Sequence, residues 1–409
     1  MPNAVFVAPF LLPATARFIA AAASLADVRL GLISQDPEQR LSDDLRAALA
    51  GHYRVSDGTD PQQIADATRA LSGHLGGVDR IIGMLEQLQV PLGEVRDALA
   101  IPGMGAAVAH NFRDKARMKT AFEAHGVPCA RHRLAHSTDE ARAAAADLGY
   151  PLVAKPPAGA GARSTFRIDD DAHLAEWLHA DPPNDQMPVL LEQMVVGDEH
   201  SFDSVLIDGE PVWHSISRYL PTPLEVLENP WIQWAVLLPR DIATPEYDVI
   251  RHEGVRGLRA LGLRTGLTHM EWFRRAGDDI AISEVAARPP GAQFTSLLSY
   301  AHDVDMYAAW ARLEIFGTFE PPERRYSVGA AYLRGQGSGT VLAVHGLDVL
   351  QRELGGIVVE AVIPRLGEVS TGTYEGEGHV VLRHRDTAVV EAGLRRVIEV
   401  ARVELGERS

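Results

Sequence analysis

The chain has 409 residues, 46% of them hydrophobic and 23% charged, which indicates a folded globular protein of about two or three domains and excludes a mini-protein, a disordered chain and a fibrous repeat. Its 39 Lys and Arg residues against 55 Asp and Glu residues give a net charge of −16, which argues against nucleic acid and anionic membrane surfaces as partners. A single cysteine, Cys129, favours a reducing, cytoplasmic compartment, and the absence of any uncharged apolar run of about 18 residues favours neither export nor a membrane span.

The N-terminal part of the chain alternates short apolar runs with helical patterns. Strands are predicted at 5–9, 28–34 and 78–83, and helices at 14–25, 61–74 and 92–100. This alternation is typical of βαβ units, so we expect a parallel sheet.

The middle of the chain begins with a single predicted helix at 111–125, which ends at Gly126 and Pro128. Further predicted elements are a strand at 130–134, a helix at 138–148, a strand at 150–155 that ends in Lys155, and a loop of small residues at 156–164. A Pro-rich stretch at 181–188 resembles a hinge.

The rest of the chain reads mainly as strands with a few helices. Strands are predicted at 188–194, in a hairpin over 199–216 that turns at 208–209, and in a pair at 266–275 and 279–288; helices are predicted at 247–261, 304–316 and 387–400.

Two lysines stand in positions that suggest phosphate binding. Lys115 lies near Arg113 and Asp114 in the predicted helix, and Lys155 ends a buried strand, where a lysine is costly unless it meets an anion. The small residues after Lys155, among them Gly159, Gly161 and Ser164, allow backbone N–H groups to approach an oxyanion. The alternative is an ordinary solvated strand end.

Two glutamates are candidates for binding a divalent cation. Glu271 and Glu284 lie thirteen positions apart on either side of a turn at 277–279, so antiparallel pairing would place their carboxylates on neighbouring strands. Magnesium is the expected ion, with manganese as an alternative. Arg288 precedes a break at Pro289 and Gly291 and is positioned to clamp a phosphoryl or carboxylate group. Taken alone, two carboxylates in strands are more often solvated or ion-paired, but together with the lysine and the glycine loop they favour a metal site.

A third candidate segment follows an apolar strand. Glu192, Gln193, Met194 and Val195 offer backbone groups and an apolar face for an adenine edge, and Glu199 is placed to accept two ribose hydroxyls. A plain β-hairpin is the alternative.

Aromatic residues gather between 213 and 234 and suggest a substrate pocket. Trp213, Arg218, Tyr219, Trp231 and Trp234 would line a site for an apolar or aromatic amino acid, with Arg218 on its carboxylate, although such a cluster also suits a core. His269 is expected either to pack within its strand or to lie near a reacting amine.

The motifs in this order resemble those of the ATP-grasp superfamily. They are DK at 114–115, a Gly-Val-Pro turn, YPLVAKPPAGAGARS, LLEQMVVGDEHS, THME and EVAARPPG. The resemblance covers the chain from Val5 to about Phe316, and the tail resembles the C-terminal domain of L-amino-acid ligases. One position departs from the pattern, because Ala286 stands where family members often carry Asn, which raises the prospect of a weaker second metal site or of lost activity.

The resemblance implies an α/β fold, α+β in parts, with ATP bound between a lid and a larger domain. The implied domains are a pre-ATP-grasp parallel α/β domain at 1–111, a linker helix and lid at 112–188, a metal-binding domain at 189–318 and a C-terminal α+β domain at 319–409. By position, Lys115 and Lys155 would bind phosphate, residues 192–195 adenine, Glu199 ribose, and Glu271 and Glu284 magnesium.

The expected activity is that of an ATP-dependent carboxylate–amine ligase that forms an acyl phosphate and then an amide, with an amino acid as substrate. Lys155 and Arg288 are the predicted catalytic residues, and Trp213, Arg218, His269, Arg288 and Gly291 are candidate substrate contacts. Two alternatives stay open: a bicarbonate-using carboxylase of the same superfamily, and a non-catalytic ATP-binding regulatory protein. A homodimer is a further expectation, since superfamily members are frequently dimers.

Overall fold

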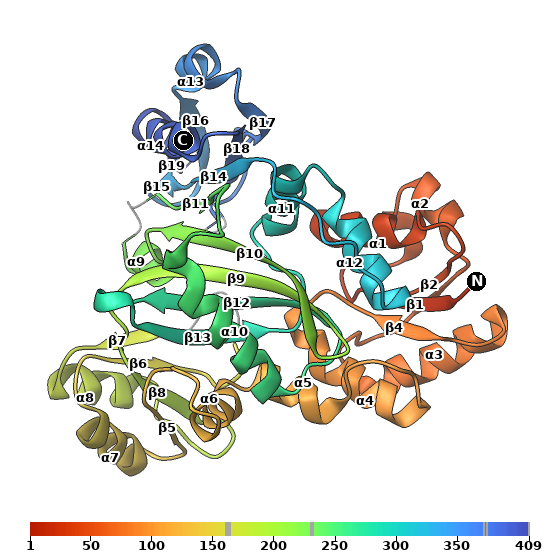
Figure 1. The fold of residues 1–409 in the computed structure, drawn as a ribbon, viewed down its shortest axis with the longest axis horizontal. Coiled ribbons are helices and arrows are strands. Elements are labelled where there is room, and N and C mark those ends of the chain that lie inside the picture. Colours follow the sequence, from red (N-terminus) through yellow and green to blue (C-terminus); the bar gives the residue numbers. More distant parts are fainter. Residues whose placement is uncertain (160–164, 230–232, 371–372, 374, 408–409) are drawn as a thin grey trace.

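The structure, a computed structural model, describes residues 1–159, 165–229, 233–370, 373 and 375–407. Figure 1 shows the N-terminal α/β part on one side, a large sheet in the middle, a smaller sheet with two helices below it, and the tail at the top. Among the described residues, no helix is long and apolar enough to cross a membrane.

The N-terminal part is the parallel α/β unit that the alternation predicted. Its four strands lie in the order β3-β2-β1-β4, and all pairs are parallel. The elements are β1 (Asn3–Val7), α1 (Pro13–Ala23), β2 (Arg29–Ser34), α2 (Asp43–Ala48), β3 (Gly51–Arg54), α3 (Pro61–Leu75), β4 (Arg80–Ile82), the 3-10 turn η2 (Glu86–Leu88) and α4 (Gln89–Leu99). The prediction missed α2 and β3, which are short and mostly polar, so neither shows a clear apolar period.

The single helix predicted at 111–125 is wrong, because the chain forms two helices there. They are α5 (Ala106–Arg113) and α6 (Lys115–Ala124). Asp114 between them has an extended backbone, and its carboxylate accepts hydrogen bonds from the N–H groups of Ala116 and Arg117. This N-cap starts a new helix at Lys115, whose own N–H donates to the Pro157 carbonyl at 2.9 Å.

The small sheet is antiparallel and lies in the order β5-β8-β6-β7. Its strands are β5 (His132–Ala135), β6 (Leu152–Lys155), β7 (Phe166–Ile168) and β8 (Val189–Gln193). The helices α7 (Thr138–Leu148) and α8 (Asp171–Ala180) bury Ala141, Leu148 and Trp177 against it. As predicted, Lys155 is the last residue of a strand.

The large sheet has eight strands in the order β13-β12-β9-β10-β11-β14-β18-β17, all paired antiparallel. The strands are β9 (Asp198–Ile207), β10 (Glu210–Leu220), β11 (Ala235–Leu238), β12 (Gly266–Arg274), β13 (Ile280–Ala286), β14 (Ser327–Leu333), β17 (Val358–Val362) and β18 (Gly378–His384). Strands from before and after residue 318 share this one sheet. The sheet therefore crosses the predicted boundary between the metal-binding domain and the C-terminal domain.

Further helices pack around the large sheet and the C-terminal tail, and the tail also forms a separate sheet of three strands. The helices are α9 (Pro223–Glu228), α10 (Asp248–Leu261), α11 (Phe294–His302), α12 (Met306–Phe316), α13 (Leu347–Leu354) and α14 (Thr387–Val400). The tail sheet joins β15 (Gly335–Gln336), β19 (Arg402–Gly406) and β16 (Thr340–His345). The last helix has its predicted bounds, whereas α11 was missed by the prediction.

Two buried histidines make the fold sensitive to acid. Burial lowers the pKa of both His200 and His302 to about 4, against a usual value near 6.5. At these two positions the unfolded chain therefore binds more protons than the native chain between about pH 4 and pH 6.5, so both histidines make the free energy of unfolding fall as the pH falls through that range.

We expect urea unfolding followed at a series of pH values to show this loss below about pH 6.5, by at most about 3 kcal/mol for each histidine. The slope should become shallower in His302→Gln. The exposed His252→Gln is the control and should keep the slope of the unchanged chain. An unchanged slope in His302→Gln would contradict the assignment.

Candidate functional site

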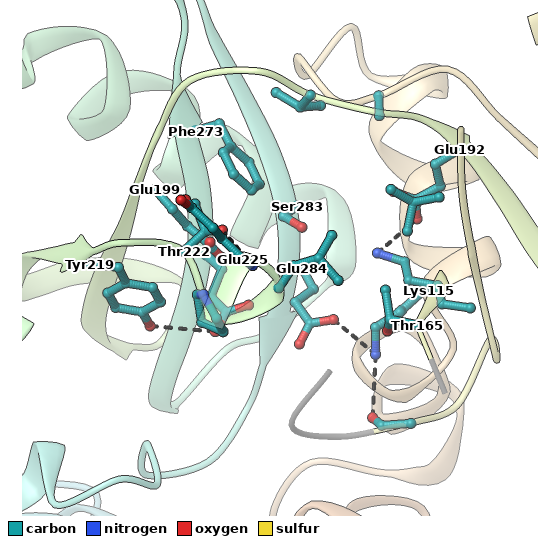
Figure 2. A pocket seen from close by; sticks show the side chains of 18 of the residues that line it. Lys115, Thr165, Glu192, Glu199, Tyr219, Thr222, Glu225, Phe273, Ser283 and Glu284 are labelled. Atoms are coloured by element: carbon teal, nitrogen blue, oxygen red, sulfur yellow. Dashed lines mark hydrogen bonds and ion pairs between the residues drawn. The ribbon is translucent and has the colours of Figure 1, made fainter. Parts of the chain in front are cut away.

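A cavity of about 580 Å³ lies between the small sheet and the large sheet. Its lining residues come from the N-terminal turn η2, the helix α6, both sheets, and the segment 222–229 that contains α9. Figure 2 shows the arrangement, with Lys115 and Glu192 on one side and Glu199, Tyr219 and Glu284 on the other. Most of the predicted site residues therefore meet in one place. They are Lys115, Lys155, Gly159, Glu192, Gln193, Met194, Val195, Glu199, His269, Glu271, Glu284, Arg288 and Gly291.

The two candidate metal ligands face each other on neighbouring strands, as the turn at 277–279 predicted. Glu271 of β12 is the direct antiparallel partner of Glu284 of β13, and the register shifts immediately after this pair. Glu199 of β9 lies opposite Phe273, two pairs further along β12. Burial raises the pKa of Glu199 well above its usual range, and the charges of Glu271 and Glu284 raise it further. The site thus gathers more negative charge than the protein neutralises at that point.

Lys115 holds the second of these carboxylates. Its Nζ lies 2.9 Å from Glu284 Oε2 and 3.3 Å from the carbonyl oxygen of Gly159, and Figure 2 draws both interactions. Burial works to raise the pKa of Glu284, but Lys115, Lys155 and Arg288 outweigh it and bring the pKa to about 2. Glu284 is therefore ionised at neutral pH and available to a cation.

Glu192 is the counter-ion of two buried lysines. Its Oε1 lies 3.0 Å from Lys155 Nζ and its Oε2 lies 3.4 Å from Lys119 Nζ. Burial opposes the charge of this carboxylate, but the two lysines overcome that effect and lower its pKa. Lys119, fully buried, is a site residue that the sequence analysis missed. Its signal was the four-residue spacing from Lys115, which puts both side chains on one face of α6.

The other residues of the predicted adenine segment turn their polar groups to the protein. The Gln193 amide donates to the Leu148 carbonyl at 2.8 Å, and the Met194 N–H donates to the Pro151 carbonyl at 3.0 Å. Both residues nevertheless line the cavity, as does Val195. Residues 192–195 could therefore contact an adenine ring through their apolar side chains and their other backbone groups.

Arg288 is fixed by the N-terminal part of the chain. Its Nε donates to Glu86 Oε2 at 2.5 Å, and its Nη1 donates to the carbonyl of Pro289 at 2.8 Å. The sequence analysis also missed Glu86, because nothing in its local sequence distinguishes it. Only the fold brings it to the cavity.

Two residues predicted to contact the substrate, Trp213 and Arg218, are not part of the cavity wall. Successive residues of a strand point to opposite faces, so Arg218 faces away from Tyr219 and contacts Tyr247 and Glu246. Trp213 lies six residues from Tyr219 along β10, about 20 Å away, and packs in the core against His302 and Phe319. Gly161, Ser164 and Trp231 lie outside the described residues.

His269 takes part in a buried polar chain beside the carboxylate pair. Its Nδ1 lies 2.6 Å from Asp203 Oδ1, and its Nε2 lies 3.2 Å from the Tyr219 hydroxyl and 3.7 Å from Glu271 Oε1. Burial lowers the pKa of His269, but Asp203 and Glu271 outweigh it and raise the pKa to about 9. This end of the cavity is closed by Trp234 and Phe294, which both pack against Tyr219.

Comparison with known proteins finds ligases and synthases. The chain is 23% identical over 247 residues to an L-arginine-specific L-amino acid ligase of Bacillus subtilis, which is 59% of each protein. It is 25% identical over 231 residues to the carbamoyl phosphate synthase large chain of Methanothermobacter thermautotrophicus, 55% of this chain and 21% of that one. The chain thus matches less than two thirds of the length of these curated relatives. No family model matches the chain.

Solved structures show the same fold over the whole length. An L-amino acid ligase from Bacillus licheniformis superimposes with a TM-score of 0.78 at 18% identity, over 100% of this chain and 99% of that one. A carboxyaminoimidazole ribonucleotide synthase from Aspergillus clavatus, complexed with ATP, gives a TM-score of 0.70 at 16% identity over 97% of each chain. These likenesses confirm the predicted α/β fold class.

Proposed function

We propose that this chain, which has the ATP-grasp fold of the structures it resembles, is an ATP-dependent carboxylate–amine ligase. The observation that carries the proposal is a single cavity that joins three groups of residues: the facing pair Glu271 and Glu284, the lysines Lys115 and Lys155, and Arg288. These groups suit a metal ion, a polyphosphate and a substrate anion respectively. The similarity to an L-amino acid ligase supports amino acids as substrates.

ATP would bind between the two sheets. Its adenine would lie along residues 192–195 and its ribose near Glu199, while Lys115 and Lys155 would contact phosphate oxygens. Each of these lysines is paired with a carboxylate in the structure, so the nucleotide would exchange one anionic partner for another. Their charges are therefore held in place before the nucleotide arrives.

The residues fit a magnesium ion. Glu271 and Glu284 provide hard oxygen ligands side by side, and a cation between them would offset the charges that, in addition to burial, raise the pKa of Glu199. When bound, Mg²⁺ supplies positive charge to the β- and γ-phosphates during phosphoryl transfer. Manganese has the same ligand preference and would serve in its place.

The chain's own residues would bind and orient the reactants through two steps. In the first, a substrate carboxylate oxygen attacks the γ-phosphorus, the bond to the β-phosphate oxygen breaks, and ADP leaves as an acyl phosphate forms. In the second, an amine attacks the acyl carbon, phosphate leaves, and the amine loses a proton. Lys155 would stabilise charge on the transferred phosphoryl group, and Arg288 would hold the carboxylate and then the oxyanion of the tetrahedral intermediate.

The aromatic end of the cavity would hold the side chain of one substrate. Tyr219, Trp234 and Phe294 form its wall, with Gly291 beside them and His269 near the reacting groups. This surface suits an apolar or aromatic amino acid. Cytoplasmic location and a homodimer are parts of the same proposal.

The proposal is tested by measuring phosphate release from Mg-ATP with pools of single amino acids, pairs of amino acids, and bicarbonate. We expect release that requires amino acids, with a product whose mass is the sum of two amino acids minus water. Release that requires bicarbonate alone would indicate a carboxylase instead. ATP binding without release on any pool would contradict the ligase proposal and favour a non-catalytic protein.

A further inference from the structure

Glu86 is a carboxylate of the N-terminal domain that reaches the cavity of the other domains. It is the first residue of η2, its side chain is 12% exposed, and it is part of the cavity wall. Its partner Arg288 is 202 residues away in the sequence. Glu86 is not among the residues proposed above to contact the nucleotide, its phosphates or the metal ion.

Glu86 and its neighbour Gln89 fasten the segment that carries Arg288. Glu86 Oε2 accepts the hydrogen bond from Arg288 Nε at 2.5 Å, and Gln89 Oε1 accepts one from the Ala287 N–H at 3.2 Å. Since Arg288 Nη1 also donates to the Pro289 carbonyl, both Nε and Nη1 of the guanidinium are held by the protein. A planar guanidinium held at two nitrogens has a fixed plane.

The same carboxylate lies next to the loop that follows Lys155. Glu86 Oε1 is 3.9 Å from Arg113 Nη1, and this nitrogen donates to the Gly159 carbonyl at 2.9 Å. Lys115 Nζ contacts that carbonyl too, at 3.3 Å. Glu86 therefore stands between the arginine that would bind substrate and the start of the phosphate loop.

We propose that Glu86 is a positioning residue of the ligase centre, through which the N-terminal domain orients Arg288 toward the substrate carboxylate. The inference rests on the proposed function. A free arginine side chain loses rotamer entropy when it is ordered, and Glu86 imposes that order before the substrate binds. The N-terminal domain thereby takes part in the chemistry although it provides none of the proposed nucleotide or metal contacts.

A double-mutant cycle separates this role from a purely structural one. The variants are Glu86→Gln, Glu86→Ala, Arg288→Ala and the double variant Glu86→Ala/Arg288→Ala, assayed with an equimolar mixture of the twenty standard amino acids. Glu86→Ala should raise the half-saturating concentration of the mixture and lower kcat, together costing about 10- to 100-fold in kcat/KM, with the KM for ATP changed less than about twofold. Glu86→Gln keeps an oxygen acceptor for Nε and should recover part of the loss.

The decisive result is non-additivity. If Glu86 acts through Arg288, the double variant is no worse than Arg288→Ala alone. Asp66→Ala is the matched control, because Asp66 pairs with Arg69 on the exposed face of α3 and should leave kcat/KM unchanged. Additive losses, or a Glu86→Ala variant as active as the unchanged chain, would overturn the role of Glu86 alone. No phosphate release by the unchanged chain would overturn both this inference and the proposed function.

Discussion

Replacing Glu284 with glutamine is expected to reduce ADP formation by at least about 10³-fold. Glutamine keeps the size of the side chain but removes its negative charge. Only Glu271, on the neighbouring strand, would then be left as a charged ligand of this pair. The change also removes the anionic partner of Lys115, so the side chain of this lysine is no longer held in position. The proposed metal site and the proposed phosphate site are therefore weakened together. The measurement is ADP release from Mg-ATP with the active amino-acid pool, at saturating nucleotide.

The matched control for this substitution lies at the start of the same strand pair. Asp279→Asn removes a carboxylate that pairs with Arg275 outside the cavity, and it should leave ADP release unchanged. Binding of ADP should also become less dependent on Mg²⁺ in Glu284→Gln, which calorimetry with and without the ion would show. Turnover by Glu284→Gln at the rate of the unchanged chain would rule out Glu284 as a metal ligand.

Replacing Glu192 with alanine is expected to destabilise the fold by about 3–5 kcal/mol. The substitution leaves two buried ammonium groups, those of Lys119 and Lys155, without the carboxylate that neutralises them. Lys119 has no exposed surface through which water could replace the lost charge. Urea unfolding at neutral pH is the measurement.

A second substitution shows whether unpaired charge is the cause. Glu192→Ala/Lys119→Met removes the more deeply buried lysine as well, so it should recover a large part of the lost free energy of unfolding. Glu353→Ala is the control, because it breaks a solvent-exposed ion pair with Arg396 and should cost much less stability than Glu192→Ala. If the double variant is no more stable than the single one, the loss comes from packing and not from the buried charges.

Both predictions follow from the proposal that Glu192 and Glu284 serve folding and function at once. In the structure, each lysine that would meet phosphate already lies beside a carboxylate of the cavity wall. A cluster of lysines without these partners would repel itself and would be costly to bury. The carboxylates therefore offset the charges of the lysines that would bind phosphate, so that these lysines can be buried close together.

The sequence by itself determined the features that depend on near neighbours. The turn at 277–279 predicted that Glu271 and Glu284 lie on neighbouring antiparallel strands, because a short turn joins strands that pair with each other. Their direct pairing also depends on the register shift between Glu271 and Trp272. The apolar run before Lys155 placed that lysine at a strand end, and regular apolar spacing predicted the final helix, Thr387–Val400, to the residue. The order of the motifs was enough to predict the fold.

Only the tertiary structure decided the features that depend on contacts between distant segments. Glu86 meets Arg288 across 202 residues, and no local pattern encodes such a meeting. Lys119 reads as an ordinary surface residue of a helix until the small sheet covers it with Glu192. The tertiary structure also decided that Tyr219 and not Arg218 lines the cavity, because β10 is buried on both faces and alternation alone does not reveal which face meets the cavity. Periodicity determines local structure, whereas the packing of separate elements determines which side chains share a site.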